Sequence, residues 1–416
     1  MVWERFRWVF CQLDTLRRCM PSSIRKTLHE LPTTLDDTYE RALGGIPREK
    51  RQHAHRLFQC LVAAIRPLRA EELAEIFAID FDGDATSFVD DWRPENAEEA
   101  VLSACSTLIS IIKDNGSKIV QFSHFSVKEF LTSDRLQEFK VRNIRYYHVA
   151  LDAAHTVLAQ ACLTVLLGLD ENVDTKRLKR LPLAFYAAQN WVNHARYEDV
   201  ATRVQDAMQE LFNPTKRYLT SWVWIHDTDQ DWDRRTIDYL TLRPPRSPPR
   251  ATALYYAALC GFSEVANYLI LFHPEDINAE SGTWGAPLHV ASRSGNGEVI
   301  DLLLQQNADV NVKSTSYYNW TPLHFASTFG HTKLVQLFLD RGADVDAQSS
   351  GYNTSLRFAA RDGHLEVARL LLLHGANVHI RGDDGLSSFQ MAMMKRHVEI
   401  AQLLLKYGAE NEQVAR

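Results

Sequence analysis

The sequence lacks the short motifs by which nucleotide-hydrolysing and many other hydrolytic enzymes are recognised. Its 416 residues contain no Gly-Lys pair, and therefore no G-x-x-x-x-G-K-[ST] loop, whose backbone amides and lysine hold the phosphates of a nucleotide. They contain no G-x-S-x-G nucleophile motif and no C-x-x-C pair either. We therefore predict that the chain is not an enzyme, has no catalytic residue and needs no cofactor.

Metal-binding patterns are equally scarce. The six cysteines are scattered along the chain, which favours buried, reduced thiols over a zinc site or a disulfide framework. Asp80, Asp82 and Asp84 resemble the start of a calcium-binding loop, but Gly83 is misplaced and Asp91 stands where a bidentate glutamate belongs. We therefore expect no metal site.

No apolar run has the length that a membrane-spanning helix needs. The most apolar run, residues 156–169, is interrupted by Gln160 and falls short of the roughly 20 residues required. Glu4, Arg5 and Arg7 interrupt the first apolar stretch, which argues against a signal peptide. The net charge of −6 comes without a strongly basic region, so neither a nucleic acid nor a membrane surface is an expected partner. We expect a soluble, cytoplasmic protein.

What the sequence does contain is a repeat. Five similar segments begin at Thr252, Ala286, Thr321, Thr354 and Ser387, so successive starts are 34, 35, 33 and 33 residues apart. This is the period of the ankyrin repeat, and residues 251–416 resemble that family closely. The resemblance implies an α-solenoid of helix pairs with β-hairpin tips, which presents one open surface and no enclosed pocket. Such a surface suits the binding of another macromolecule better than it suits catalysis.

Glycines mark the helix ends within these segments. A glycine lies nine residues after the start in four of the five segments, where the first short helix has to end, because glycine adopts positive φ angles without a steric clash. The second segment has Asn307 at the end of its second helix, and asparagine also tolerates the left-handed region. The fifth segment has Arg396 in place of the first-helix glycine, and we interpret it as a capping repeat.

Two groups of repeat residues are candidates for a specific role. His289 and His324 occupy a T-P-L-H box, where the family resemblance implies hydrogen bonding within and between repeats, so we interpret them as structural. Aromatic residues also collect at the predicted hairpin tips: Trp284, Tyr317, Tyr318, Trp320 and Tyr352. Tryptophan and tyrosine carry much of the binding energy at protein interfaces. We predict that these five contact a protein partner on the concave face of the solenoid; the open alternative is that some pack on the next repeat.

The first half of the chain has helical patterns interrupted by one hairpin pattern. Apolar stripes with helical spacing cover residues 3–16, 34–46, 52–65 and 70–79. The second of these begins with a capping-box pattern of Thr34 and Asp37. Residues 107–112 and 118–122 flank Asn115-Gly116, a strong signal for a two-residue hairpin turn. Helices followed by a hairpin predict a winged helix.

A proline-rich stretch, RPPRSPPR at residues 243–250, separates this half from the repeats and predicts a stiff linker. The predicted fold is therefore mostly α, in five parts. They are a helical segment (1–50), a winged-helix-like domain (51–140), a helical spacer (141–242), the linker (243–250) and the ankyrin repeats (251–416).

A family resemblance rests on three stretches of the first half. They are FRWVFCQL at residues 6–13, LPTTLDDTY at 31–39 and FSHFSVKEFL at 122–131. Together they resemble the region that follows the NTPase core in fungal NACHT–ankyrin proteins, which are STAND-type, NOD-like signalling ATPases. In that family, ligand-sensing repeats follow an NTPase, a winged helix and a helical spacer, and nucleotide exchange switches a closed monomer into an assembly. The resemblance covers most of residues 1–140 and extends more loosely to about 240.

The chain departs from that family because it lacks the NTPase core and begins about where that core ends. The resemblance therefore implies the carboxy-terminal part of such a receptor, as a short product or an incomplete gene model. In relatives, a winged-helix histidine reaches the β-phosphate of bound ADP, and His124 occupies the matching position. Without an NTPase in the same chain we interpret His124 as structural or vestigial. The open alternative is a phosphate latch that works with an NTPase module supplied in trans.

These observations predict a non-catalytic scaffold or sensor that binds a protein through its ankyrin repeats. Two alternatives stay open. The first is a nucleotide-regulated STAND switch that requires an NTPase module in trans. The second is a DNA-binding regulator that uses the winged helix, which the acidic residues Glu71, Glu72 and Glu75 disfavour because they would repel phosphate.

Overall fold

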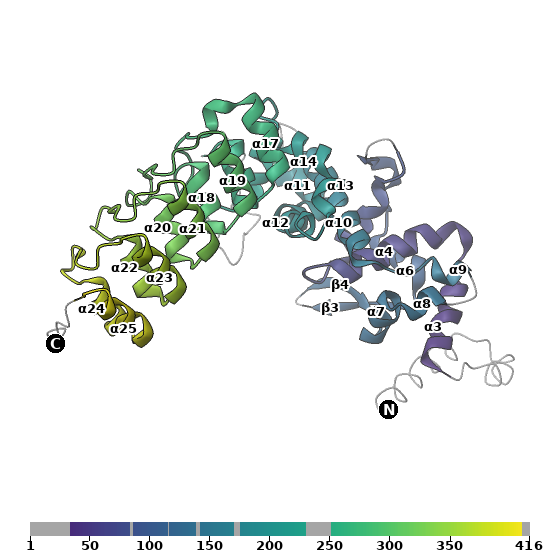
Figure 1. Ribbon diagram of the computed structural model, residues 1–416. Helices are drawn as coiled ribbons and strands as arrows, with labels where there is room; N and C mark the ends of the chain where they lie inside the picture. Colours follow the sequence, from purple (N-terminus) through teal and green to yellow (C-terminus); the bar gives the residue numbers. More distant parts are fainter. Residues whose placement is uncertain are drawn as a thin grey trace, which may run out of the picture. The chain divides into compact units, whose positions relative to one another are not determined.

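The computed structural model describes residues 34–83, 86–114, 116–138, 142–169, 175–229 and 251–409. They belong to two compact units, one in which the described residues end at Leu211 and one in which they begin at Phe212. Figure 1 shows the helices and strands of each unit. The predictions for residues 1–33, which include the stretch at 6–13, and for the linker at 243–250 lie outside the described residues.

The first part of the first unit consists of short helices and a β-hairpin. Its helices are α3 (Leu35–Gly44), α4 (Arg51–Ala63), α5 (Ala70–Ala74), α6 (Ala97–Cys105), α7 (Phe125–Thr132), α8 (Arg135–Glu138) and α9 (Arg142–Arg145), with 3₁₀ turns at Arg48–Lys50, Glu75–Ala78 and Asp90–Trp92. The helix expected over residues 70–79 is shorter than predicted, because a 3₁₀ turn follows α5 and a short strand pair, β1 (Ile79–Asp80) with β2 (Ser87–Phe88), follows that turn.

The predicted hairpin is present. Strand β3 (Ile109–Asp114) pairs antiparallel with β4 (Ser117–Phe122), and Gly116 in the turn has a φ of +83°, a conformation that glycine adopts without strain. The amide of Val120 also donates to the carbonyl of Leu68 at 2.9 Å, which brings a third chain segment to the edge of β4. Helices followed by this hairpin confirm the winged-helix prediction.

The second part of the first unit is helical throughout. Its helices are α10 (Leu151–Leu167), α11 (Thr175–Lys179), α12 (Leu183–Ala195), α13 (Val200–Arg203) and α14 (Gln205–Leu211). Helix α10 packs against α4 on one side and α12 on another, which explains why its sequence is apolar all round. Among the described residues no helix combines the length and apolarity needed to cross a membrane.

The second unit contains α15 (Tyr218–Ile225) and five helix pairs. The first helices of the pairs are α16 (Ala253–Cys260), α18 (Pro287–Ser294), α20 (Pro322–Thr328), α22 (Ser355–Asp362) and α24 (Ser388–Met394). The second helices are α17 (Ser263–Phe272), α19 (Gly297–Gln305), α21 (Thr332–Asp340), α23 (Leu365–Leu373) and α25 (Val398–Lys406), and a 3₁₀ turn (Pro274–Asp276) follows α17. Each first helix packs against the next first helix, so the pairs form a stack (Figure 1).

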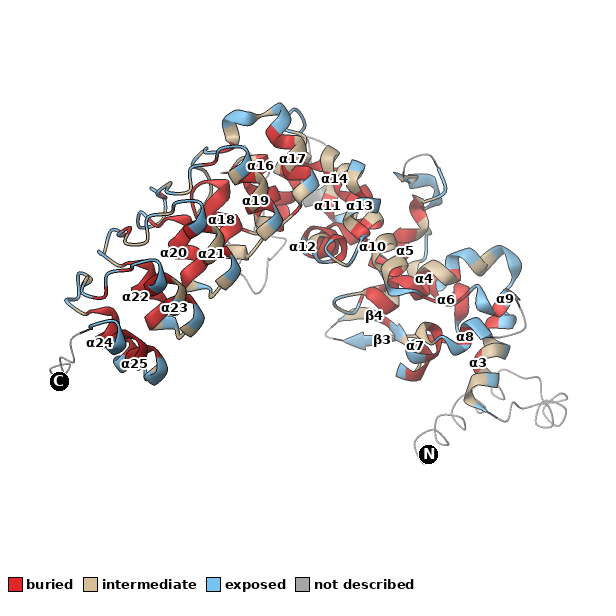
Figure 2. Cartoon of the chain, in the orientation of Figure 1, coloured by how far each residue is buried: buried red, intermediate tan, exposed pale blue. Residues whose placement is uncertain are grey.

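Local chemistry sets the ends of these helices. All five predicted starts are N-cap residues, and in four of them a threonine or serine hydroxyl accepts a backbone amide of the first turn. Gly261, Gly295 and Gly363 end first helices in the left-handed conformation. Asn307 and Arg396 adopt it as well, with φ angles of 63° and 64°. Buried residues line the helices of the stack, and the hairpin loops are largely exposed (Figure 2).

The stack begins on a helix that the sequence did not assign to it. Trp222 of α15 is fully buried and its ring lies 6.1 Å from that of Tyr256 in the first repeat. Asp229, just after α15, accepts a hydrogen bond of 2.5 Å from the hydroxyl of Tyr255 and one of 2.7 Å from the amide of Thr283. The compact unit therefore extends beyond the repeats at their amino-terminal end.

Candidate protein-binding surface

Backbone hydrogen bonds join the successive hairpin tips. The amide of Ser350 donates to the carbonyl of Tyr318 at 2.8 Å, and the amide of Asp383 donates to the carbonyl of Gly351 at 3.0 Å. Each bond connects one tip to the next repeat's tip. The tips of the third, fourth and fifth repeats are therefore held in register, and side chains at their ends form one surface.

A chain of aromatic contacts runs beneath these tips. Trp284 lies 4.7 Å from Tyr317, Tyr317 lies 5.1 Å from Trp320, and Trp320 lies 4.4 Å from Phe358, measured between ring centroids. Phe325 of α20 is fully buried at the centre, in contact with the first three of these rings. Contacts at these distances favour tilted and edge-to-face pairs, so rings from three repeats form one cluster.

The five aromatic residues predicted from the sequence belong to this region but differ in exposure. Trp284 and Trp320 are each only 8% exposed, and Tyr317 is half-buried. Tyr318 is 66% exposed and Tyr352 is 59% exposed. The two tryptophans therefore follow the alternative in which some of these residues pack on the neighbouring repeat. Tyr318 and Tyr352, in contrast, expose most of their side chains to solvent.

The two exposed tyrosines also have an unfavourable backbone. Tyr318 has a φ of 51° and Tyr352 a φ of 54°, in the left-handed region, where a bulky residue costs roughly 1–2 kcal/mol more than glycine. The ring of Tyr318 contacts that of Tyr317 at a centroid distance of 5.1 Å, but most of each of the two side chains is exposed to solvent. Strained conformations of this kind concentrate at functional sites, so these two positions are the strongest candidates for contact with a partner.

The histidines of the T-P-L-H boxes are structural. Nδ1 of His289 accepts the amide of Ala286 at 3.0 Å, and Nε2 donates to the carbonyl of Val312 at 3.0 Å. His324 makes the equivalent pair of bonds at 3.0 and 3.1 Å. Burial lowers the pKa of both histidines to about 4. Both rings are therefore neutral near pH 7, with one nitrogen accepting and the other donating.

In the last two repeats, the position of the T-P-L-H histidine (the box position) is occupied by another residue. In the fourth, Arg357 replaces histidine, is only 3% exposed, and pairs with Asp384 and Asn353. In the fifth, Gln390 accepts the amide of Ser387 at 2.9 Å through Oε1. Gln390 thus accepts the amide of the N-cap residue as the two histidines do, but its side chain has no titratable group.

Two arginines that were not predicted from the sequence join the aromatic cluster. The guanidinium of Arg293 lies 4.4 Å from the ring centroid of Trp284 and 5.3 Å from that of Phe329, which is 41% exposed. The guanidinium of Arg361 lies 4.9 Å from the ring centroid of Phe358. Aligning the repeats in register would have revealed these arginines, because both occupy the same place in their first helix. We call the surface formed by Arg293, Tyr317, Tyr318, Phe329, Tyr352 and Arg361 the hairpin face.

His124 caps a helix. Its Nδ1 accepts the amide of Ser126 at 3.1 Å at the start of α7, and lies 2.7 Å from the hydroxyl of that serine. The same hydroxyl lies 2.7 Å from that of Tyr39, whose ring packs on Phe130. Residues 34–39 and 122–131 therefore meet in the fold through Tyr39, Ser126 and Phe130.

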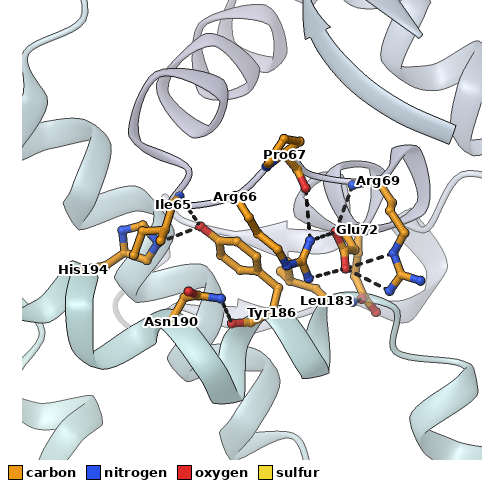
Figure 3. A network of polar contacts seen from close by, with 10 residues as sticks. Ile65, Arg66, Pro67, Arg69, Glu72, Leu183, Tyr186, Asn190 and His194 are labelled. Carbon is orange, nitrogen blue, oxygen red and sulfur yellow. Dashed lines mark hydrogen bonds and ion pairs between the residues drawn. The ribbon is translucent and has the colours of Figure 1, made fainter. Parts of the chain in front are cut away.

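A polar network connects the two parts of the first unit (Figure 3). Arg66 makes two hydrogen bonds of 2.8 Å to Glu72, which also pairs with Arg69 at 2.9 Å. Burial alone would raise the pKa of Glu72, but the two arginines outweigh it and hold that pKa below its usual range. The amide of Leu183 donates to Glu75 at 2.7 Å, and burial raises the pKa of Glu75 to about 7.

This network corrects the charge argument drawn from the sequence. Glu72 and Glu75 are buried, so they do not present negative charge to an approaching phosphate. The helix directly before the hairpin is α6, and it carries Glu98 and Glu99 in its first turn. The carboxylates of α6 disfavour DNA binding because they would repel its phosphates, which is the reason given earlier for Glu71, Glu72 and Glu75.

The other end of the network is also buried. The hydroxyl of Tyr186 accepts the amide of Ile65 at 3.2 Å and lies 2.8 Å from Nε2 of His194 (Figure 3). Nδ1 of His194 lies 2.9 Å from Nδ1 of His155. Burial lowers the pKa of His194 to about 3, so its ring is neutral. Tyr186 then donates to Nε2, and Nδ1 of His194 donates to His155, an arrangement that stabilises the joint between the helices.

The calcium-like sequence does not act as a loop of ligands in the part that the structure describes. Asp82 pairs with Arg56 at 2.8 Å and accepts a hydrogen bond from Gln52 at 2.8 Å, while Asp84 lies outside the described residues. Across the described residues, no group of three or more histidine, cysteine, aspartate or glutamate side chains is placed to hold a metal ion.

Comparison with known families agrees with this geometry. Residues 254–349 match the family model described as ankyrin repeats (3 copies), and residues 356–405 match ankyrin repeats (many copies). Residues 39–142 match the model described as GPI inositol-deacylase, winged helix domain. The chain joins that winged helix domain to ankyrin repeats. The matched region begins at residue 39, within α3.

A curated relative covers much of the chain. It is the Azaphilone pigments biosynthesis cluster protein L of Monascus ruber, 34% identical over 302 residues. The match includes 68% of this chain and 61% of that protein. The chain therefore spans less than two thirds of the length of this relative.

Proposed function

We propose that this ankyrin–winged helix chain is a non-catalytic scaffold that binds a protein partner on the hairpin face. Ankyrin repeats are protein-interaction modules, and their stack offers an open surface for a partner. The observation that carries the proposal is the pair of exposed tyrosines, Tyr318 and Tyr352, held at the ends of adjacent tips in the left-handed conformation. Large aromatic side chains on a preorganised surface are typical of interface anchors.

Replacing both tyrosines with glycine tests this proposal. The Tyr318→Gly/Tyr352→Gly variant is expected to capture its partner from a cell lysate at least about tenfold more weakly, equivalent to about 1.4 kcal/mol. Its thermal stability is expected to stay the same or rise slightly, because glycine relieves the left-handed backbone. Quantitative pull-down with the full chain measures the first effect, and calorimetric unfolding measures the second.

A tyrosine elsewhere provides the control. Tyr407 is 40% exposed at the end of α25, and Tyr407→Ala removes a comparable ring from outside the hairpin face. Capture is expected to be unchanged in this variant. Full capture by the glycine variant with its fold intact would rule out the tips as the binding surface.

We further propose that the chain corresponds to the part of a NOD-like receptor that follows the NTPase core. The order of a winged helix domain, a helical region and ankyrin repeats supports this proposal. So does the hydrogen bond between the hydroxyls of Tyr39 and Ser126, which joins residues of two of the stretches that carry the resemblance. His124 uses Nδ1 to cap α7, so this ring nitrogen has a structural role in the fold.

Calorimetric titration of the full chain with ADP tests whether the receptor-type switch operates without a partner. We expect no heat of binding, since the sequence has no phosphate-binding loop. Saturable heat that disappears in His124→Ala would instead support the nucleotide-regulated alternative and contradict the scaffold proposal. Ser133→Ala, a change at the other end of α7, is the control for a general loss of structure.

A further inference from the structure

Arg293 and Arg361 occupy the same position in two repeats. Each stands seven residues after the N-cap of its repeat, in the last turn of a first helix. Each guanidinium lies over an aromatic ring that is largely buried, Trp284 for the first and Phe358 for the second. Cation–π contact with a fixed ring restricts a long side chain before any ligand arrives. The two charges are therefore preorganised.

The two arginines flank a single aromatic cluster. Tyr317 lies in the ring chain that connects Trp284 to Phe358. Burial raises the pKa of Tyr317, and the positive charges of Arg293 and Arg361 both oppose that rise. Both cations therefore act on the same hydroxyl, one from the second repeat and one from the fourth. A ligand that reaches from the second repeat to the fourth would contact both.

Charge is distributed unevenly over the repeat unit. The first helices, the turns directly after them and the hairpin tips contain six cations and four anions: Arg293, Arg357, Arg361, Arg381, Lys395 and Arg396 against Glu280, Asp362, Asp383 and Asp384. The other described residues from 251 to 409 contain five cations and eleven anions. Those helices, turns and tips therefore carry a formal charge of +2, and the other described residues from 251 to 409 carry −6. A negatively charged ligand complements these elements better than it complements the rest of the repeats.

The immediate surroundings of the arginines favour a short anionic ligand over a long polyanion. Nε and Nη2 of Arg361 both bond to Asp362 at 2.8 Å, which fixes the plane of the guanidinium and leaves Nη1 for a ligand oxygen. The remaining surface of the unit carries the excess of acidic residues described above. Those residues would repel a nucleic acid that extended beyond the hairpin face.

We propose that the hairpin face binds an extended acidic peptide segment of the partner protein. Its carboxylates pair with Arg293 and Arg361, and an apolar side chain between them packs against Tyr318 and Tyr352. This inference rests on the proposed function and adds the chemical class of the partner. Charge-assisted hydrogen bonds from the arginines to the carboxylates give the register, and the tyrosine rings give the apolar contact.

Fluorescence anisotropy with the full chain tests the inference. The first probe is a fluorescein-labelled peptide with two glutamates flanking a phenylalanine in a glycine–serine background. The second probe has lysines in place of the glutamates, and the third is a single-stranded oligothymidylate. The glutamate peptide is expected to bind, more weakly as salt is raised. The Arg293→Gln/Arg361→Gln variant is expected to bind it at least about tenfold more weakly.

A matched variant removes the same charge from another part of the unit. Arg341 is the C-cap residue of α21 and pairs with Asp301. Arg369 lies within α23 and pairs with Glu366. Arg341→Gln/Arg369→Gln is expected to change the affinity by less than about twofold, since these charges lie outside the hairpin face. Equal losses in the two double variants would show a general effect of charge and would overturn the inference.

The remaining outcomes also decide the question. No binding of the glutamate peptide, equal binding of the lysine peptide, or tighter binding of the oligothymidylate would each contradict an acidic peptide ligand. Partner capture from lysate separates this inference from the proposed function. If capture is lost in the tyrosine variant but not in the Arg293→Gln/Arg361→Gln variant, the hairpin face is supported as the binding surface and the acidic peptide is contradicted as its ligand. Retained capture in both would remove both proposals.

Discussion

Replacing Phe325 with alanine is expected to lower the free energy of unfolding of the ankyrin unit by about 3–5 kcal/mol. Phe325 is fully buried in α20, and its ring contacts Trp284, Tyr317 and Trp320 at centroid distances of 6.0, 5.6 and 5.0 Å. These rings come from more than one repeat. Alanine would therefore open a cavity at a junction where several rings lose a shared partner, and not only within one helix.

Urea denaturation of the full chain, followed by tryptophan fluorescence, measures this loss. Phe329→Ala is the control in the same repeat, because Phe329 is 41% exposed and its truncation is expected to cost less than about 1 kcal/mol. A cost for Phe325→Ala as small as that of the control would show that the aromatic cluster does not hold the stack together. The prediction also implies that Tyr317 and Tyr318 lose their defined positions in this variant.

Acid is expected to destabilise the ankyrin unit through His289 and His324. Their pKa is lowered by burial from 6.5 to about 4, so between these pH values the unfolded chain binds more protons than the folded chain. The free energy of unfolding therefore falls as the pH drops from about 6.5 to about 4. At 1.36 kcal/mol per pKa unit, each histidine contributes on the order of 3 kcal/mol to this fall.

The fifth repeat supplies the variant that tests this. Gln390 occupies the box position there and accepts the amide of Ser387, so His289→Gln/His324→Gln copies chemistry that the stack already uses. Stability of this variant is expected to vary much less with pH over the same window. Glu75 in the first unit has the opposite sign, because its pKa is raised to about 7 and its protonation in acid favours the folded state. A pH dependence that the two substitutions leave unchanged would assign the effect to other groups.

The repeat part of the fold was predictable because its signals are local and recur. An N-cap hydroxyl followed by a short helix and a glycine at positive φ specifies the same turn wherever it occurs, and all five predicted starts are N-cap residues in the structure. The hairpin at β3 and β4 was predictable for the same reason, since its turn residues are adjacent in sequence.

Features that depend on distant residues were not predictable in this way. Glu72 reads as a surface acid in the sequence, but Arg66 and Arg69 enclose it once the segment before α5 turns. Trp320 reads as an exposed loop residue, yet Phe358 of the following repeat covers it. The docking of α15 on the first repeat depends on contacts across a long stretch of chain. Each of these outcomes follows from packing between elements, which a linear pattern does not contain.

The left-handed tyrosines have a consequence for how such a surface persists over generations. Glycine or asparagine at positions 318 and 352 would suit the backbone better than tyrosine does. Mutational drift under selection for folding alone would therefore remove both rings, and a laboratory selection for heat resistance would reach the same residues. Under the proposed function, binding of a partner protein is what selects for these two side chains, so related sequences that lose the partner are expected to lose both rings.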